Sequence, residues 1–536
     1  MTSTYIDLFK SYHWNELYES VKLTQYDSAI PIQSQQPLAL KAMLLVSWWQ
    51  DSVTSKEIFK HFPPLLTDPL THFCVAYGYM CLGDVPKLKH YLKNTPKAQP
   101  KWMKIYLDLE YQGRSLKFHE QIKTLKKITS TNNFPDYAIV ALLQSLEHEK
   151  ADITLLKEYL SSLSLSPNSP SPLMILLYNR AGLIHIDDVD VSTSPLLLLR
   201  KSRHLFRSLE LIDTLKSYDL LVQTKMLDIN CINEWLMTSV SIPQGRDYLL
   251  KRVEFALSLA PNSLFIQGTL ASYALIHSYR SGEYKTAYAI VLKYHEYTKL
   301  AKSYFIKNAQ VFFNYTLSLC ATWQHNTHLY ANDSQNLKPI EVYGESHSLS
   351  LSNIRLDSLY NNECFGRINF VMGAKMHHLK KDNDTFYSKA LQLYFQTIQN
   401  SANLIFTIGE IDTRPDEGIW QVHLKKEKNL EEIIDNTVGG YIGFLYENLK
   451  EKQLNSITIQ GIPVPNYALE GDKDPKDKEG FLNMIKQVNE KLKNLTLEKG
   501  WNFLDVYSAT LGEDGKSNKK WHIDGYHLQP IFYTEA

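Results

Sequence analysis

The chain has 536 residues, and its 57 Lys and Arg residues balance 57 Asp and Glu residues, so the formal net charge is zero. At about 150 residues per domain, this length predicts three to four domain-sized units rather than one core. The hydrophobic content of 44% and charged content of 21% exclude wholesale disorder, and a neutral chain has no global field that attracts nucleic acid or an anionic membrane surface, so we expect no nucleic-acid partner.

Cysteine usage and apolar runs indicate the compartment. The five cysteines are odd in number, widely spaced and without a Cys-x-x-Cys pair, which indicates neither a disulfide framework nor a zinc knuckle. The first thirty residues contain no apolar run of signal-peptide type, and the longest apolar stretch, 37–49, is short and contains Lys41. We therefore expect a cytoplasmic protein with no membrane span.

Residues 1–325 are predicted to be all-helical, because apolar residues recur there at three- and four-residue spacing. In the clearest part, the sequence Ala-Pro-Asn-Ser at 260–263 ends one helix, 264–279 forms the next, and 281–284 turn the chain into a third at 285–299. This helix hairpin of about 34 residues has the length of one tetratricopeptide unit.

Two further segments echo the hairpin. The sequence at 163–169 nearly repeats that at 257–263, and 76–84 has the form of another bend between helices. The region therefore resembles tetratricopeptide-like repeats, and the alternative is an irregular helical bundle. Stacked helix pairs present an extended concave face, so we expect a protein partner on this region and a hinge in the Ser/Pro-rich stretch 161–172.

A second domain is predicted at 336–536, where strand and helix patterns alternate. Alternation of this kind favours an open, mainly parallel sheet with helices on both faces. Such sheets place their chemistry beyond the carboxyl ends of the strands. The predicted strands are 340–343, 367–372, 403–408, 456–460 and 502–506, and the predicted helices are 385–399, 430–450 and 478–495.

Polar residues and glycines follow these strands. Ser346 follows the first strand and Gly373 the second, while Asp524 and His527 follow the last. A hydroxyl nucleophile needs a base to take its proton and a third group to fix the tautomer of that base, and Ser346, His527 and Asp524 supply these groups. Glycine permits a tight turn and close backbone approach, so the amides of Ser346 and Gly373 are predicted to stabilise an oxyanion.

This pattern resembles the SGNH (GDSL-like) hydrolase family from Lys338 to the C terminus. Gly344-Glu345-Ser346 resembles the first block of that family, Gly373 its second-block glycine, 409–412 its third block, and Asp524-x-x-His527 its last. The resemblance implies a three-layer, flavodoxin-like fold. It also implies ester hydrolysis or acyl transfer, frequently on acylated saccharides or lipids.

The chain departs from the family pattern in two places. Glu345 replaces the usual aspartate before the serine, and Ile411 occupies the third-block position of an asparagine that donates to the oxyanion. Loss of one such donor typically lowers turnover by about 10² to 10³. Arg414 presents several fixed donors and is the expected substitute, and with Glu410 and Asp412 it forms a predicted substrate-binding set. Alternatively, these three residues form a structural ion-pair cluster.

Other interpretations of the same residues are structural. Ser346 could cap a following helix, and Gly373 could be only a turn. His347, His377 and His378 could suggest a metal, but adjacent histidines on a helix point to different faces and no carboxylate completes a ligand spacing. We therefore expect no metal and no cofactor other than an acyl donor.

The sequence thus predicts a serine-dependent ester hydrolase or O-acyltransferase that acts on an acylated carbohydrate or glycoconjugate. Water as the acceptor gives an esterase, and a sugar hydroxyl gives an acyltransferase. A first rival is a non-catalytic binding or adaptor protein with a degenerate SGNH-like domain, which Ile411 supports. A second is a sugar transferase that uses Glu410 or Asp412, although neither a Gly-rich phosphate loop nor a paired-aspartate motif supports it.

Overall fold

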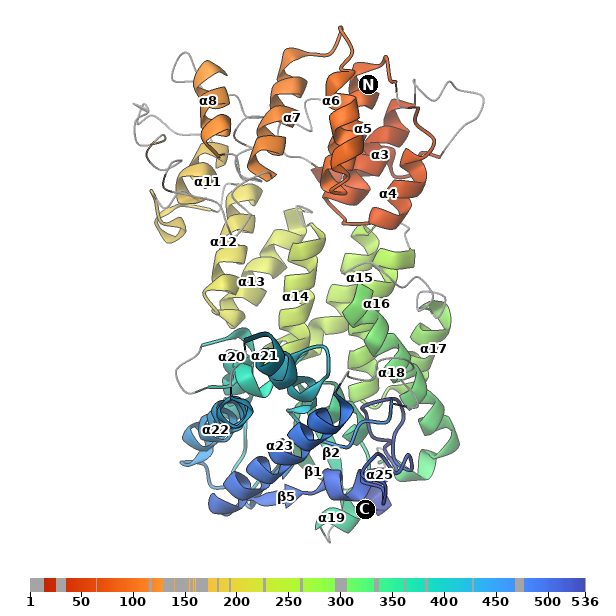
Figure 1. The fold of residues 1–536 in the computed structure, drawn as a ribbon, viewed down its shortest axis with the longest axis vertical. Helices are drawn as coiled ribbons and strands as arrows, with labels where there is room; N and C mark the ends of the chain where they lie inside the picture. The colour runs from red at the N-terminus through yellow and green to blue at the C-terminus, as the bar shows by residue number, and fades with distance from the viewer. Residues whose placement is uncertain are drawn as a thin grey trace. The chain divides into compact units, whose positions relative to one another are not determined.

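The computed structural model divides into two compact units (Figure 1). Unit 1 comprises Met1–Glu234 with Leu259–Ile266, and unit 2 comprises Trp235–Ser258 with Gln267–Ala536. The residues that the structure describes are 14–25, 35–63, 65–114, 118–128, 139, 154, 158, 160, 172–180, 183–191, 194–224, 228–260, 264–294, 306–331, 337–360, 363–380, 384–426, 429–467 and 477–535.

Unit 1 is helical throughout its described segments, as predicted. The helices are α2 (Trp14–Val21), α3 (Gln36–Ser47), α4 (Ser52–Phe59), α5 (Pro69–Cys81), α6 (Val85–Lys93), α7 (Lys101–Arg114), α8 (Phe118–Ile128), α11 (Pro172–Arg180), α12 (Pro195–Arg207), α13 (Leu211–Leu221) and the start of α14 (Ile229–Ser241). Helices α4, α5, α6 and α12 start at side-chain caps: at α5 the Asp68 carboxylate accepts from the Thr71 N–H, and Pro69 opens the same helix with the backbone angle that a first turn requires.

Two predicted turns between helices are confirmed. Gly83 joins α5 to α6 with a φ of 71°, and Gly282 joins α16 to α17 with a φ of 82°. Glycine adopts this left-handed conformation without steric cost, which explains its place at both bends. The predicted hinge at 161–172 lies outside the described residues except for its last position. The later helices are α15 (Leu249–Leu259), α16 (Leu264–Arg280), α17 (Tyr284–Tyr294) and α18 (Ile306–His325).

The α/β part of unit 2 contains one five-stranded sheet in the order β2-β1-β3-β4-β5, with every pair of neighbours parallel. Val342 at the centre pairs with Ile368 on one side and Ile405 on the other. All five predicted strands are confirmed, with bounds of β1 (Lys338–Gly344), β2 (Cys364–Phe370), β3 (Asn403–Phe406), β4 (Ser456–Gln460) and β5 (Asn502–Leu504).

Helices connect these parallel strands, which cannot be joined by tight hairpins. The three predicted helices are confirmed as α20 (Phe386–Gln396), α22 (Leu430–Leu449) and α23 (Lys478–Glu498), and α23 packs against both α22 and β5 (Figure 1). Shorter helices, which the sequence patterns did not indicate, are α19 (Asp357–Tyr360), α21 (Gly418–Lys426), α24 (Val506–Thr510) and α25 (Phe532–Glu535).

Aromatic side chains join the sheet to its helices. Tyr343 of β1 stacks on Phe406 of β3 with ring centroids 5.2 Å apart. The edge of the Phe395 ring of α20 packs against Tyr343, with ring centroids 5.7 Å apart. On α18, the Phe312 ring lies 5.8 Å from that of Phe370 in β2. Helix α18 therefore belongs to the core around the sheet.

The compact units divide the chain differently from the predicted ranges 1–325 and 336–536. Those ranges mark the change from helices to alternating strands and helices, whereas unit 2 also includes 235–258 and 267–325. Packing within unit 2 explains the difference, since the Met372 N–H beyond β2 donates to the Ser241 hydroxyl at 3.3 Å. Across the described residues, no helix combines the length and apolar character needed to cross a membrane.

Candidate active site

The end of β1 brings Ser346 over the carboxyl edge of the sheet. A Cβ atom on Gly344 would lie 2.0 Å from the Thr407 hydroxyl oxygen, so glycine is needed for this close approach to the chain beyond β3. The 3₁₀ turn η7 (Ser346–Leu351) follows directly, and Ser346 is 5% exposed within it. Ser346 therefore begins a buried turn and does not cap a longer α-helix.

The C-terminal loop holds Asp524 and His527 together. One Asp524 oxygen accepts from the Tyr526 N–H at 2.9 Å and the His527 N–H at 2.7 Å, and the other lies 2.7 Å from His527 Nδ1. Burial acts to raise the pKa of Asp524, yet His527 and the two backbone donors hold it below its ordinary value. The three-residue spacing thus lets one carboxylate shape the loop and orient the ring.

These two segments meet at Ser346. His527 Nε2 lies 2.8 Å from Ser346 Oγ, although the residues are 181 positions apart in the chain. The structure therefore joins Ser346, His527 and Asp524 in one chain of hydrogen bonds. The Asp524 carboxylate can only accept, so His527 carries a proton on Nδ1 and presents Nε2 to the serine.

A second carboxylate and a second histidine flank the same hydroxyl. Glu345 Oε2 accepts from the Ser346 hydroxyl, and Glu345 Oε1 lies 2.8 Å from His347 Nδ1. The far ring nitrogen of His347, Nε2, lies 3.2 Å from the Tyr526 carbonyl oxygen. The side chains of Glu345 and His347 are both buried, each with 1% of its surface exposed.

Burial and pairing have opposite effects on these two groups. Burial acts to raise the pKa of Glu345, but His347 outweighs it and lowers that pKa from 4.5 to about 2. Burial likewise acts to lower the pKa of His347, but Glu345 raises it from 6.5 to about 9. The pair is therefore charged at neutral pH.

The Ser346 hydroxyl has one proton and two neighbouring acceptors. If it donates to Glu345, the contact with His527 requires a proton on Nε2, and His527 is an imidazolium. If His527 is neutral, Nε2 accepts the hydroxyl proton, and Oγ is ready for nucleophilic attack. The protonation of His527 thus decides whether Ser346 is activated.

Two rings stack against His527. Tyr315 of α18 lies 3.9 Å away between ring centroids with planes 20° apart, and His347 lies 4.3 Å away with planes 30° apart. The Tyr315 hydroxyl is 2.7 Å from Ser350 Oγ, which donates to the Leu528 carbonyl. A helix that precedes the sheet in sequence thus contributes a wall of the site.

Arg414 and Glu410 form a closed ion pair at the end of β3, in and beside the turn η9 (Glu410–Thr413). Arg414 Nε lies 3.0 Å from both Glu410 oxygens, and its Nη2 lies 2.7 Å from one of them. The guanidinium also lies 5.1 Å from the centre of the Tyr526 ring. Burial acts to lower the pKa of Arg414, but Glu410 raises it above its ordinary value. This arrangement matches the structural alternative for Glu410 and Arg414.

Asp412 has a separate role in the same turn. It accepts from the Met376 N–H at 2.6 Å and lies 2.9 Å from His377 Nδ1, so it fixes the turn η8 (Met376–His378) that follows β2. Gly373, just before that turn, has a φ of 73°, a conformation that favours glycine. Ile411 is buried and offers no side-chain donor.

Within the described residues, two clusters bring metal-ligating side chains together. The first is Glu345, His347 and His527, but every ring nitrogen in it already has a hydrogen-bond partner. That arrangement favours a chain of hydrogen bonds over coordination. The second cluster lies at the surface of unit 1 and consists of His185, Asp187 and His204.

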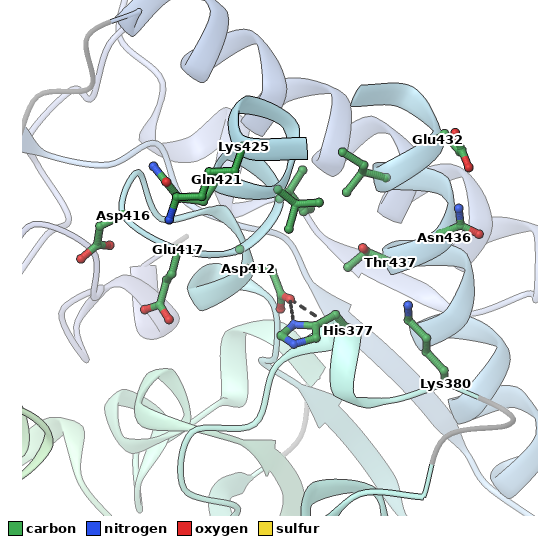
Figure 2. A pocket seen from close by; sticks show the side chains of 14 residues that line it. His377, Lys380, Asp412, Asp416, Glu417, Gln421, Lys425, Glu432, Asn436 and Thr437 are labelled. Atoms are coloured by element: carbon green, nitrogen blue, oxygen red, sulfur yellow. Dashed lines mark hydrogen bonds and ion pairs between the residues drawn. The ribbon is translucent and has the colours of Figure 1, made fainter. Parts of the chain in front are cut away.

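A cavity of about 580 Å³ lies between η8, η9, α21 and α22 (Figure 2). Asp412 and His377 lie at its wall and are joined by their hydrogen bond, while Gln421 of α21 and Asn436 of α22 lie on other walls. None of Ser346, His527 and Asp524 lines it. Among the predicted substrate-binding residues, Asp412 is the one that reaches this cavity.

Sequence reasoning missed three contributors to the site: Glu345 as a hydrogen-bond partner, His347 and Tyr315. The spacing Glu345-x-His347 was a signal for the first two, because a carboxylate two residues before a histidine can reach its ring in a tight turn. No local pattern marks Tyr315, which lies in an ordinary helix. A scan against protein-family models and a search of curated proteins each found no match to this chain.

Proposed function

We propose that the protein is a serine-dependent ester hydrolase or O-acyltransferase of SGNH type. The observation that carries the proposal is the hydrogen-bonded chain from Ser346 through His527 to Asp524 at the carboxyl edge of a parallel sheet. A hydroxyl, an imidazole and a carboxylate in this order are the parts of a serine nucleophile with its base and orienting group.

In this mechanism His527 Nε2 takes the Ser346 proton while Oγ bonds to the acyl carbonyl carbon. The carbonyl π electrons move to oxygen, and the amides of Ser346 and Gly373 donate to that oxyanion. Collapse of the tetrahedral intermediate breaks the bond to the alcohol, which leaves with the proton from His527. Water or a sugar hydroxyl then takes the acyl group by the reverse sequence.

The substrate class is an acylated carbohydrate or glycoconjugate, by analogy with the SGNH family. The cavity beside Asp412 is lined by none of Ser346, His527 and Asp524, so the substrate class is proposed on the family resemblance alone. A protein partner on the tetratricopeptide-like helical region is part of the same proposal, because stacked helix pairs present a binding face.

The second candidate is a non-catalytic binding protein. Ile411 supplies no donor, and two of the nitrogens of Arg414 are occupied by Glu410. Ser346 and His527 are also only 5% and 2% exposed, so little of either reaches the surface. These observations favour a degenerate site, and one experiment separates the two functions.

The experiment is covalent labelling of the full chain by a fluorophosphonate, together with hydrolysis of an aryl acetate. The enzyme predicts labelling at Ser346 that Ser346→Ala abolishes. The matched control is Ser348→Ala, because Ser348 lies in the same turn and its hydroxyl donates to the Glu345 carbonyl, whereas His527 Nε2 faces the Ser346 hydroxyl. Absence of labelling in the folded parent protein would favour the binding protein.

A further inference from the structure

We propose that His185, Asp187 and His204 bind one divalent transition-metal ion at the surface of unit 1. Each of the three side chains offers a ligand atom, and these atoms lie within 4.8 Å of one another. The proposal goes beyond the acyl chemistry and does not depend on it, since all three residues belong to unit 1 whereas Ser346 belongs to unit 2. The expectation of no metal rests on histidines of the α/β part alone.

The donor atoms indicate which metal the cluster takes. Two imidazole nitrogens and one carboxylate oxygen suit Zn²⁺ and related transition metals, whereas Ca²⁺ and Mg²⁺ take oxygen ligands. Three protein ligands leave the fourth position of a tetrahedral Zn²⁺ ion to water or to another ligand. Because His185 and Asp187 are exposed and His204 is half-buried, water can reach that position. The ligand is therefore an ion of the zinc class with one open position.

The distances between the donor atoms fit a tetrahedral ion. Two ligand atoms that each lie about 2.05 Å from such an ion are about 3.3 Å apart. His185 Nδ1 lies 3.1 Å from Asp187 Oδ2, and His204 Nε2 lies 3.8 Å from the same oxygen. The longer contact exceeds a hydrogen bond, and a movement of about half an ångström by the His204 ring brings it to the tetrahedral value.

The two imidazole rings fit the same geometry. Imidazoles bound to one tetrahedral ion have ring centroids about 5.2 Å apart, because each centroid lies beyond its donor nitrogen on the line from the metal. The centroids of His185 and His204 are 5.4 Å apart, and the ring planes are at 90°. An edge-to-face contact alone also gives such a distance. It does not explain why one oxygen of Asp187 lies close to a nitrogen of both rings.

Packing holds the backbone that carries the ligands. The first two ligands flank Ile186, which is fully buried and begins the 3₁₀ turn η2 (Ile186–Asp188). His204 lies in the last turn of α12, and η2 packs against that helix. The Val189 N–H donates to the Ile186 carbonyl at 3.2 Å and closes the turn. A metal ion at this place therefore ties η2 to α12.

Neighbouring polar groups orient the same segments. Asn179 of α11 donates to the Ile184 carbonyl at 3.1 Å, and its side-chain oxygen accepts from Arg200 of α12 at 2.8 Å. Lys201 Nζ lies 4.0 Å from Asp187 Oδ1, which is the oxygen that the histidines do not contact. Outer contacts of this kind fix the orientation of metal ligands. The lysine thus leaves Oδ2 for the metal.

The test is calorimetric titration of the full, chelator-treated chain with Zn²⁺. The parent is expected to bind the ion, and His204→Gln to weaken binding at least about 100-fold, since even outer-shell partners typically contribute about 10- to 100-fold. The matched control is His90→Gln, because His90 is exposed in the last turn of α6 and belongs to neither cluster of the described residues. Absence of binding in the parent, or equal binding in His204→Gln, would overturn the inference.

Two further variants keep the test decisive if His204→Gln does not fold, as judged by circular dichroism. The side chains of His185 and Asp187 are 62% and 49% exposed, so His185→Gln and Asp187→Asn are expected to fold like the parent. Each is expected to lose Zn²⁺ binding to a similar extent. Binding that both variants retain at the strength of the parent would show that the ion lies elsewhere and would overturn the inference.

Hydrogen exchange tests the tie between η2 and α12. Zn²⁺ is expected to slow exchange of the Val189 amide in the parent and to leave it unchanged in Asp187→Asn, since a bound ligand opposes local opening of the segment that holds it. An amide that exchanges equally fast with and without saturating Zn²⁺ in the parent would overturn the assignment of these ligands.

Discussion

Two clusters of buried polar side chains lie at the same edge of the sheet, one beyond β1 and one beyond β3. At the end of β3, Arg414 donates to Glu410, and the two charges satisfy each other. At the end of β1, the Ser346 hydroxyl has a single proton and lies beside both Glu345 and His527. The difference shows that buried charge does not by itself indicate catalysis. In the pair of Glu410 and Arg414, the carboxylate stays ionised and the guanidinium stays protonated, so neither group transfers a proton.

The largest expected effect tests the cluster at the end of β1, where Ser346 meets His527 and Asp524. Asp524→Asn keeps an acceptor for the loop N–H groups but can stabilise the wrong tautomer of His527, so the turnover of an aryl ester is expected to fall by about 10⁴-fold. The measurement is kcat at saturating substrate, with circular dichroism as the control for folding. Turnover within tenfold of the parent would contradict the assignment of Asp524.

The next effect tests the ion pair between Glu410 and Arg414 at the end of β3. Arg414→Met leaves the Glu410 carboxylate buried without its cation, which is expected to reduce the free energy of unfolding by about 3 to 5 kcal/mol. Glu410→Gln/Arg414→Met is expected to recover most of that loss, as measured by urea unfolding. If the single variant instead stays stable but loses labelling rate, Arg414 is a donor to the reaction, as the sequence suggested.

Tyr315 tests whether the helix before the sheet is part of the site. Tyr315→Ala removes the ring that stacks on His527 and is expected to lower stability by about 3 kcal/mol and slow labelling. Tyr315→Phe keeps the ring and loses only the hydroxyl partner of Ser350, with an expected cost of about 1 kcal/mol. Equal effects of the two variants would assign the role to the hydroxyl rather than to the stack.

The smallest effect is a change of stability with pH. The pKa of Glu345 is depressed from 4.5 to about 2 in the folded chain, so its contribution is fully present above pH 4.5 and is lost as the pH falls toward 2. The urea concentration at the unfolding midpoint should therefore change less between pH 6 and pH 3 for Glu345→Gln than for the parent protein. Parallel curves for the two proteins would show that Glu345 adds no stability of this kind.

The sequence patterns predicted most of the α/β fold because each strand and helix carries its own signal. The β4 bounds match the prediction, and α22 differs from it by one residue. The short helix α21 was missed, since nine residues that start at a glycine show little amphipathic pattern. The compact units also could not be read from the helical pattern of 235–325, which is the same whether those helices pack on each other or on a sheet.

What the sequence determined by itself was the candidate chain of Ser346, His527 and Asp524, because parallel strands end at one edge and each residue follows a strand. Only the tertiary structure decided that the Ser346 hydroxyl lies beside both Glu345 and His527, that His347 pairs with Glu345, and that Tyr315 stacks on His527. The positions of strands and helices depend on periodicity along the chain, whereas hydrogen-bond partners and stacked rings depend on distances of a few ångströms between segments far apart in sequence.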